Sequence, residues 1–171
     1  QEDQNYLPAT RQGMGLAAPG DVVLDMDGVR PPFLTLVHGT SKELIERFNA
    51  GDLVLKQMAA VIRGNLRRED LAARIGGEEF AIVLPETAAE NACVFANTLR
   101  EAIAAEIFVL GGEPRHLTVS IGIAGLGPHA NDRSSLMRNA DKALYHAKDA
   151  GRNRVCLCAS EDCVCKEAAS G

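Results

Sequence analysis

The chain has 171 residues, of which 46% are hydrophobic and 24% charged, a composition typical of a globular domain with one hydrophobic core. Its formal net charge of −5 excludes a broad basic surface for duplex nucleic acid, so an anionic ligand needs a local cation cluster or a metal ion. No apolar run approaches the roughly 18 residues that cross a bilayer, and no signal-peptide pattern opens the chain. We therefore expect a cytoplasmic domain, and the initial Gln indicates a piece of a longer protein.

The first part of the chain contains a linker and two short strands. Residues 1–20 carry glycine and proline without a sustained period, which predicts an irregular segment. Residues 21–27, D-V-V-L-D-M-D, have the pattern of a buried strand that ends in carboxylates, and residues 33–37, F-L-T-L-V, form a second strand candidate. Apolar residues then recur at helical spacing, so we expect an amphipathic helix over about 52–67.

The stretch R-I-G-G-E-E-F, residues 74–80, lies between two predicted strands and indicates the turn of a β-hairpin. Gly76 and Gly77 leave the backbone open to the phosphates of a ligand. Glu78 and Glu79 offer the hard oxygen ligands that Mg²⁺ or Mn²⁺ binds together with substrate phosphates. A bare Gly-Gly-Glu-Glu turn is also compatible with two solvated acids and no ligand.

The second half of the chain alternates helices with strands. Thr87 and Glu90 have the spacing of a capping box and open a predicted helix. Residues 117–124 alternate like a half-buried strand, residues 133–150 have helical periodicity ending at Gly151, and R-V-C-L-C closes as a strand. This order predicts an α/β or α+β sandwich around one mixed sheet.

Lys148 and Arg152 are four positions apart at the end of the last predicted helix, so their side chains project together. Such a pair can hold the terminal phosphates of a nucleotide. Two cations at the C-terminal end of a helix can also stay in solvent and stabilise the helix through its dipole, without binding a ligand.

Cysteines are concentrated near the C-terminal end. Cys93 falls in a helical pattern and is expected to be a small buried hydrophobe. The run C-L-C-A-S-E-D-C-V-C, residues 156–165, could bind a soft metal, but its spacing is tighter than that of zinc fingers and no histidine accompanies it. We expect reduced thiols on a strand, followed by a frayed tail over residues 158–171.

Taken together, four ordered motifs closely resemble the GGDEF family, the diguanylate cyclases. The stretch R-I-G-G-E-E-F matches the family signature in its G-G-E-E-F form. The segments A-D-K-A-L-Y-H-A-K-D-A-G-R-N-R-V, L-T-V-S-I-G-I-A and A-G-D match the closing helix and strand, the strand before them, and an upstream element. The resemblance covers about residues 49–157, and we assign the family domain to residues 21–157.

The resemblance implies a palm-like nucleotide-cyclase fold, an α+β sandwich whose mixed, mostly antiparallel sheet is flanked by helices. It implies that two GTP condense to cyclic di-GMP with release of pyrophosphate, in a homodimer under a sensory or regulatory domain outside this chain. Carried over by position, Glu78 would bind metal and Glu79 would assist with metal or with the 3′-hydroxyl. Asp52 would bind the guanine edge, Gly76 and Gly77 would lie against the nucleotide, and the terminal phosphates would be held by Lys148 and Arg152.

The stretch R-R-E-D contains R-x-x-D, with Arg67 and Asp70 placed before the signature as in the family's product-inhibition site. The resemblance implies that Arg67 and Asp70 bind cyclic di-GMP. An arginine that the family often adds on the next helix falls at Thr98 here. Taken alone, R-x-x-D is usually an ion pair at a helix end.

The N-terminal third departs from the family pattern. Counting back from the A-G-D element places the metal aspartate at Thr35, whereas the strand-then-acid pattern favours Asp25, with Met26 lending a carbonyl. If Thr35 is the equivalent, the chain is a degenerate domain that binds GTP or cyclic di-GMP as a regulator. The segment V-V-L-D-M-D also resembles motif one of haloacid-dehalogenase-type phosphatases, with Asp25 as nucleophile and Asp27 as acid/base. The remaining chain fits that family poorly.

Overall fold

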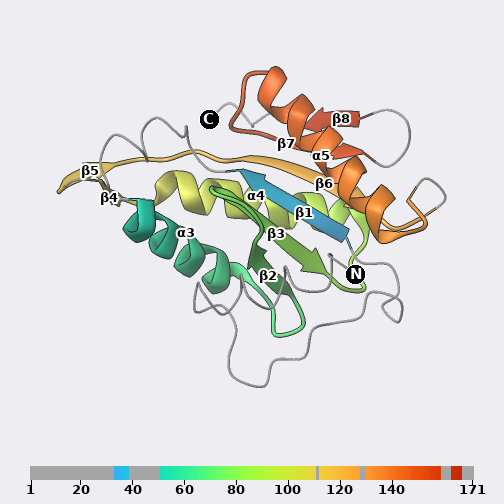
Figure 1. Cartoon of the computed structure of the whole chain (residues 1–171), viewed down its shortest axis with the longest axis horizontal. Helices are drawn as coiled ribbons and strands as arrows, with labels where there is room; N and C mark the ends of the chain where they lie inside the picture. The colour runs from blue at the N-terminus through green and yellow to red at the C-terminus, as the bar shows by residue number, and fades with distance from the viewer. Residues whose placement is uncertain (1–32, 39–50, 111, 128–129, 159–162, 167–171) are drawn as a thin grey trace.

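The computed structural model describes residues 33–38, 51–110, 112–127, 130–158 and 163–166 (Figure 1). A six-stranded sheet has the order β2-β3-β1-β6-β7-β8, and β4 and β5 form a separate hairpin. In chain order the elements are β1 (Phe33–His38), α3 (Gly51–Asn65), β2 (Leu71–Arg74), β3 (Glu79–Leu84), α4 (Ala89–Ala105), β4 (Phe108–Leu110), β5 (Glu113–Arg115), β6 (Ser120–Gly125), α5 (Arg133–Asp149), β7 (Val155–Cys158) and β8 (Cys163–Lys166). Strands β6 and β7 are parallel, and the other neighbours in the sheet are antiparallel. The predicted α+β sandwich with a mixed, mostly antiparallel sheet is confirmed.

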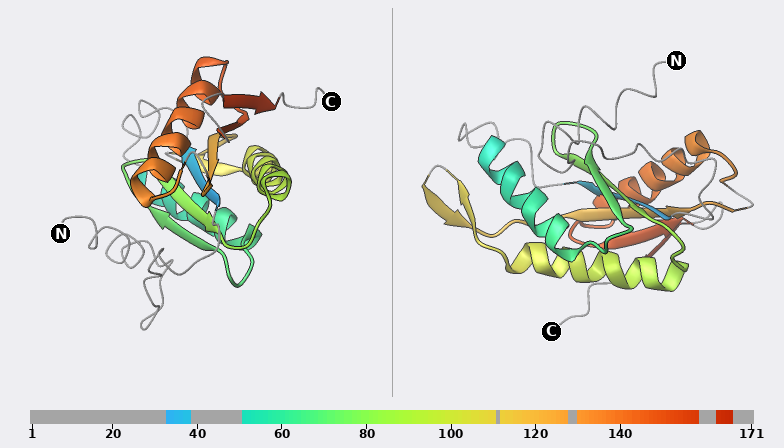
Figure 2. Two further views of the ribbon diagram at one scale, coloured as in Figure 1. Left: turned by 90° about the vertical axis from the view of Figure 1, so that its right-hand side faces the viewer. Right: turned by 90° about the horizontal axis from the view of Figure 1, so that it is seen from below.

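The sheet separates helices α3 and α4 on one face from α5 on the other (Figure 2). Side chains of a strand point alternately to its two faces, and β3 follows this rule. Phe80, Ile82 and Leu84 belong to the large core beneath α3 and α4. Ala81, between them, packs in the smaller core beneath α5. Strand β3 therefore contributes side chains to a core on each face of the sheet.

Helix α5 lies very close to the sheet because β6 has a glycine beneath it. A Cβ built on Gly122 would fall on the backbone of Ala140 and Leu144 in α5. The small residues Ala124 and Ala140 are fully buried in the same layer. This contact fixes the helix that carries Lys148 and precedes the loop with Arg152.

Two local predictions are wrong. The expected capping box of α4 does not form, because the helix begins after Ala88 and the Thr87 hydroxyl donates to the carbonyl of Pro85 at 2.9 Å. The strand expected to be half-buried, β6, is buried on both faces from Ser120 to Ala124, because α5 covers its second face. The predicted end of α5 at Gly151 is confirmed, as are the hairpin around Gly76 and the strand within residues 33–38.

The C-terminal cysteines form disulfide bonds, which corrects the expectation of reduced thiols and a frayed tail. Residues 163–166 form strand β8, antiparallel to β7, and directly opposed residues are joined as Cys156–Cys165 and Cys158–Cys163. All four side chains pack with Ala143 and Ala147 of α5. Cys93 is free of a disulfide and buried in α4, as expected.

Candidate active site

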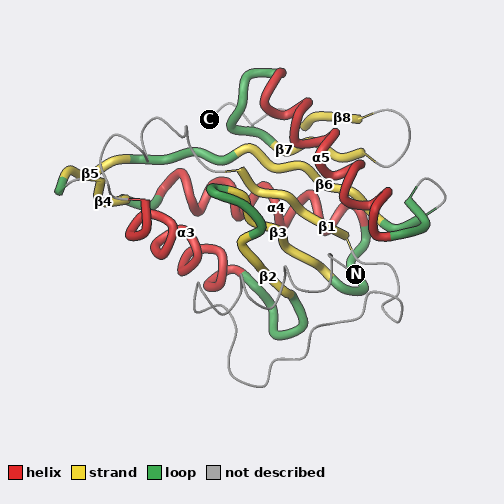
Figure 3. The backbone as a smooth tube through the Cα atoms, viewed as in Figure 1, coloured by secondary structure: helices red, strands yellow, loops and turns green. Residues whose placement is uncertain are grey.

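Two loops that carry predicted site residues leave the sheet at the same end. Glu79, at the start of β3, is opposite His38 of β1, which is opposite Ser120 of β6. The next residue of β6, Ile121, is level with Val155 at the start of β7. The β2–β3 turn and the α5–β7 loop are therefore about 14 Å apart, the sum of three strand spacings. Figure 3 traces both loops in green.

The β2–β3 turn is held by its own arginine. The Nε of Arg74 donates to the carbonyls of Gly76 at 2.9 Å and Gly77 at 3.1 Å, and Nη2 donates to Gly77 at 2.6 Å. The amide of Ile75 donates to the carbonyl of Glu79 at 2.9 Å, closing the hairpin. Sequence reasoning missed this role of Arg74, although the residue opens the signature stretch.

The two glycines of the turn have different surroundings. A Cβ on Gly76 would lie 3.0 Å from a carboxylate oxygen of Glu79, so the glutamate side chain lies against this glycine. Gly77 is exposed and faces open space, as a backbone that a phosphate can approach must do. Glu78 and Glu79 are both half-buried at the tip.

Helix α5 presents a polar face at the same end of the sheet. Tyr145, Lys148, Asp149 and Arg152 line an open depression of about 340 Å³. Lys148 is half-buried there and Arg152 is exposed. The structure thus brings the two predicted phosphate-binding cations together.

A carboxylate that sequence reasoning missed belongs to this region. Partial burial raises the pKa of Asp141, and so does the negative charge of Glu79, while Lys148 lowers it. Asp141 on α5 is therefore within electrostatic reach of Glu79 on the turn and of Lys148. Its signal in the sequence is the spacing of seven to Lys148, which places both residues on one helix face.

The α5–β7 loop has an unusual backbone. Gly151 follows the last turn of α5 with φ +112°, and the amides of Gly151 and Arg152 donate to the carbonyls of Lys148 at 3.3 Å and Ala147 at 3.0 Å. These bonds form a Schellman motif. Arg152 and Asn153 continue with φ of 62° and 46°, the left-handed region that arginine rarely adopts.

The predicted inhibition residues lie at the opposite end of the sheet from the turn. Asp70 directly precedes β2, and β2 runs from there to Arg74 at the turn. A carboxylate oxygen of Asp70, Oδ2, accepts the backbone amide of Arg67 at 2.8 Å, and Asp70 is buried while Arg67 is exposed. Oδ1 of Asp70 is buried without a hydrogen-bond partner among the described residues.

The structure describes some of the remaining predicted residues and not others. Asp52 lies in the first turn of α3. Asp25, Asp27 and Met26 lie outside the described residues. The strand next to β3 is β1, in which Thr35 is level with Ile82 of β3.

The donor set at the turn suits a hard divalent cation. Glu78 and Glu79 supply carboxylates, and adjacent like charges favour a cation between them. Within the described ranges, no three His, Cys, Asp or Glu side chains gather closely enough to hold a metal ion. Mg²⁺ is commonly bound in this way, by one or two carboxylates with substrate phosphates completing its shell.

The sheet, the helices on its two faces and the carboxylate turn define a palm-like α+β domain of the nucleotide-cyclase type. The family model "Diguanylate cyclase, GGDEF domain" matches residues 48–154. The chain belongs to the GGDEF family. None of the helices in the described residues has the length and apolar character to cross a membrane.

Relatives and solved structures agree with this assignment. The chain is similar to Diguanylate cyclase A of Treponema denticola, with 39% identity over 108 residues, covering 63% of this chain and 29% of that protein. It resembles the GGDEF domain of DgcB from Caulobacter crescentus in complex with c-di-GMP (TM-score 0.69, 30% identity, 78% of this chain and 80% of that chain). It also resembles the active GGEEF domain of a diguanylate cyclase from Vibrio cholerae (TM-score 0.67, 32% identity, 74% of this chain and 82% of that chain).

Proposed function

We propose that this domain condenses two GTP molecules into cyclic di-GMP and releases two pyrophosphates. The observation that carries the proposal is the common position of two charged groups at one end of the sheet. Glu78 and Glu79 on the β2–β3 turn supply carboxylates, and Lys148 and Arg152 at the end of α5 supply cations. A nucleoside triphosphate with a divalent cation is the ligand whose charges match both groups.

Each residue has a definite task in this reaction. Glu78 and Glu79 would hold Mg²⁺ or Mn²⁺, and the ion would supply charge neutralisation at the phosphates and at the 3′-hydroxyl. Lys148 and Arg152 hold the β- and γ-phosphates, and Asp52 accepts hydrogen bonds from the guanine edge. The 3′-oxygen of one GTP attacks the α-phosphorus of the other, the bond from that phosphorus to pyrophosphate breaks, and the proton of the 3′-hydroxyl passes to solvent. The reaction then repeats with the two nucleotides exchanging roles.

Two copies of the domain act together in this account. One sheet end offers one carboxylate turn and one cation pair, so each copy holds one GTP. The two sites have to face each other for a ring of two nucleotides to close. A homodimer, controlled by a domain outside this chain, is therefore part of the proposal.

Product inhibition is assigned to Arg67 and Asp70. Support comes from the exposed side chain of Arg67, whose guanidinium would pair with a phosphate of cyclic di-GMP. Asp70 would take guanine N–H donors once its carboxylate, which is buried here, turns toward the ligand. These residues lie at the other end of β2 from the turn, so inhibitor and substrate occupy separate places.

One observation favours a second candidate, a domain that binds GTP or cyclic di-GMP without turnover. Strand β1 neighbours the carboxylate-bearing strand β3, and its sequence F-L-T-L-V-H contains no acid. The proposed metal ligands Asp25 and Met26 must then approach the turn from the segment before β1.

Conservative substitution of the turn distinguishes the candidates. Glu79→Gln keeps the size of the side chain and removes its charge, so we expect it to abolish GTP turnover with Mg²⁺. Glu113→Gln changes another glutamate, exposed on β5, and we expect turnover to stay at the wild-type rate. If the wild-type chain binds GTP and neither it nor any variant forms product, the second candidate replaces the first.

A further inference from the structure

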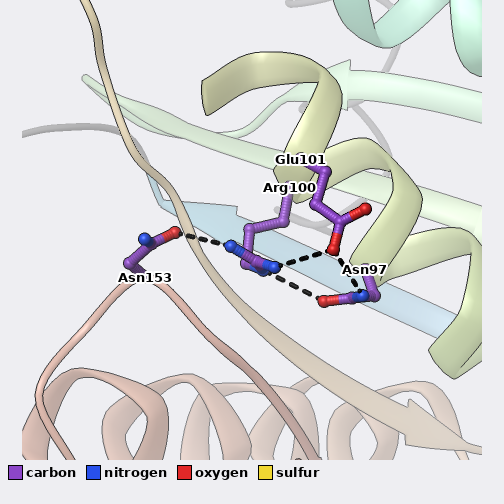
Figure 4. A network of polar contacts seen from close by, with 4 residues as sticks. All are labelled: Asn97, Arg100, Glu101 and Asn153. Carbon is purple, nitrogen blue, oxygen red and sulfur yellow. Dashed lines mark hydrogen bonds and ion pairs between the residues drawn. The ribbon is translucent and has the colours of Figure 1, made fainter. Parts of the chain in front are cut away.

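A buried arginine on α4 connects that helix to the loop that carries Arg152 (Figure 4). Arg100 is only 6% exposed, and each of its guanidinium nitrogens has a partner. Nε donates to Asn97 Oδ1 at 3.0 Å and Nη2 to Glu101 Oε1 at 3.1 Å, both on α4. Nη1 donates to Asn153 Oδ1 at 3.0 Å, which is 53 positions away in the α5–β7 loop.

The bond from Arg100 to Asn153 is important because of the place of Asn153 in the chain. Asn153 directly follows Arg152, and both have positive φ. Asparagine tolerates this conformation but arginine rarely adopts it, so Arg152 keeps it only where neighbouring contacts impose it.

Several contacts hold the loop conformation, among them the second Schellman bond, from Gly151 to Lys148, and the bond from the amide of Ile121 in β6 to the carbonyl of Arg154 at 2.9 Å. The backbone amide of Arg152 donates to Ala147 at 3.0 Å, which ties the loop to the helix before it. The Nε of Arg154 donates to the carbonyl of Arg152 at 3.1 Å, which is a contact within the loop. The bond from Arg100 to Asn153 is the contact that anchors the loop to a different helix, on the opposite face of the sheet.

We infer that Arg100 is a positioning residue for Arg152. By holding Asn153 it fixes the backbone on one side of Arg152, while the Schellman bonds fix the other side. The Arg152 side chain is thereby directed to the depression that it lines with Lys148. This inference rests on the proposed function, in which Arg152 binds the terminal phosphates of GTP.

The alternative role of Arg100 is structural: its buried, hydrogen-bonded guanidinium would stabilise the fold without affecting Arg152 in particular. The two roles predict different behaviour in nucleotide binding. A structural residue would affect every guanine nucleotide equally. A residue that acts through Arg152 affects only ligands with a β- or γ-phosphate, and it has no further effect once Arg152 is removed.

The test compares the affinity for α,β-methylene GTP, whose α–β bond cannot be cleaved, with the affinity for GMP, in Mg²⁺ by calorimetry. Asn153→Gly removes the acceptor of the bond from Arg100, and glycine still adopts a positive φ. Arg100 keeps its partners Asn97 and Glu101 on α4, so the variant does not leave the buried arginine unpaired. We expect it to lower the triphosphate-over-monophosphate preference several-fold, and Arg152→Ala to lower it about tenfold or more, as loss of a charge-assisted bond does. Asn153→Asp keeps an oxygen for Nη1 and retains the preference. Arg115→Gln, which removes an exposed charge on β5, is the control for net charge.

The double variant Asn153→Gly/Arg152→Ala tests whether Asn153 and Arg100 act through Arg152. We expect it to show the preference of Arg152→Ala alone. A preference that is normal in Asn153→Gly, or an equal loss of affinity for both nucleotides, would overturn the positioning role while the proposed function stands. A normal preference in Arg152→Ala would instead contradict the proposed phosphate clamp, and the positioning role would fall with it.

Discussion

The Nη2 of Arg74 donates to the carbonyl oxygen of Gly77 at 2.6 Å, so an arginine at the end of β2 fixes the tip that carries both glutamates. We predict that Arg74→Gln lowers the free energy of unfolding by about 1 kcal/mol, because a charged donor to backbone carbonyls is lost. Hydrogen exchange at the amides of residues 76–78 should become faster, with little change in α5. Unchanged exchange in the turn would show that Arg74 does not hold it.

The close contact between β6 and α5 gives a second prediction. Gly122→Ala places a methyl group on the backbone of Ala140 and Leu144, so we expect a loss of about 1–3 kcal/mol in unfolding free energy. Gly64→Ala is the matched control, because Gly64 lies within α3 and nothing is near a Cβ there. It should stabilise by about 0.5–1 kcal/mol, since alanine favours a helix over glycine. Urea unfolding measures both, and equal effects would contradict the packing described for α5.

The start of α5 should be sensitive to acid. The backbone amide of Ser135 and then its hydroxyl donate to Asp132, and both hold the pKa of that carboxyl below its ordinary value of 3.8. A lowered pKa in the folded state gives stability that is fully present above the ordinary value and lost as pH falls through the lower one.

The matched variants are Asp132→Asn, which keeps a neutral cap, and Asp132→Ala, which removes the cap. Between about pH 5 and about pH 3, the wild type should lose more stability than Asp132→Asn. At neutral pH, Asp132→Ala should have the lowest melting temperature of the three. A parallel acid response of the wild type and Asp132→Asn would mean that the carboxylate is not the cap.

The disulfide bonds can be counted directly. Of the five cysteines Cys93 alone lies outside the two disulfide bonds, so alkylation in denaturant without reductant should modify one residue, and after reduction it should modify all five. The Cys156–Cys165 bond closes a separation of 9 residues, so Cys165→Ser should cost up to about 2–3 kcal/mol by the loop-entropy model. Five modifications without reductant would show reduced thiols, as most cytosolic proteins have. The result therefore also bears on the expected cytoplasmic location, which stays a prediction.

Local patterns predicted those parts of the fold that depend on neighbours in the sequence. The hairpin at Gly76 and the end of α5 at Gly151 are of this kind, because a turn and a Schellman motif are formed by consecutive residues. The proximity of the two cations was predicted, but not its cause: Lys148 lies on α5, whereas Arg152 lies in the loop after it, and the Schellman turn brings both to one depression.

Contacts between distant segments were not predictable in this way. The burial of both faces of β6 depends on α5, and the bond from Arg100 to Asn153 joins a helix to a loop on the far side of the sheet. Each of these required knowledge of which elements pack together.

The most direct test of the account is incubation of the purified chain with GTP and Mg²⁺ over a range of chain concentrations, with the nucleotides separated by chromatography. We predict cyclic di-GMP and pyrophosphate in a ratio of one to two, formed at a rate per chain that rises with concentration because two domains must meet. Intact GTP at every concentration, with GTP bound to the chain, would contradict catalysis and leave a nucleotide-binding domain of the same family.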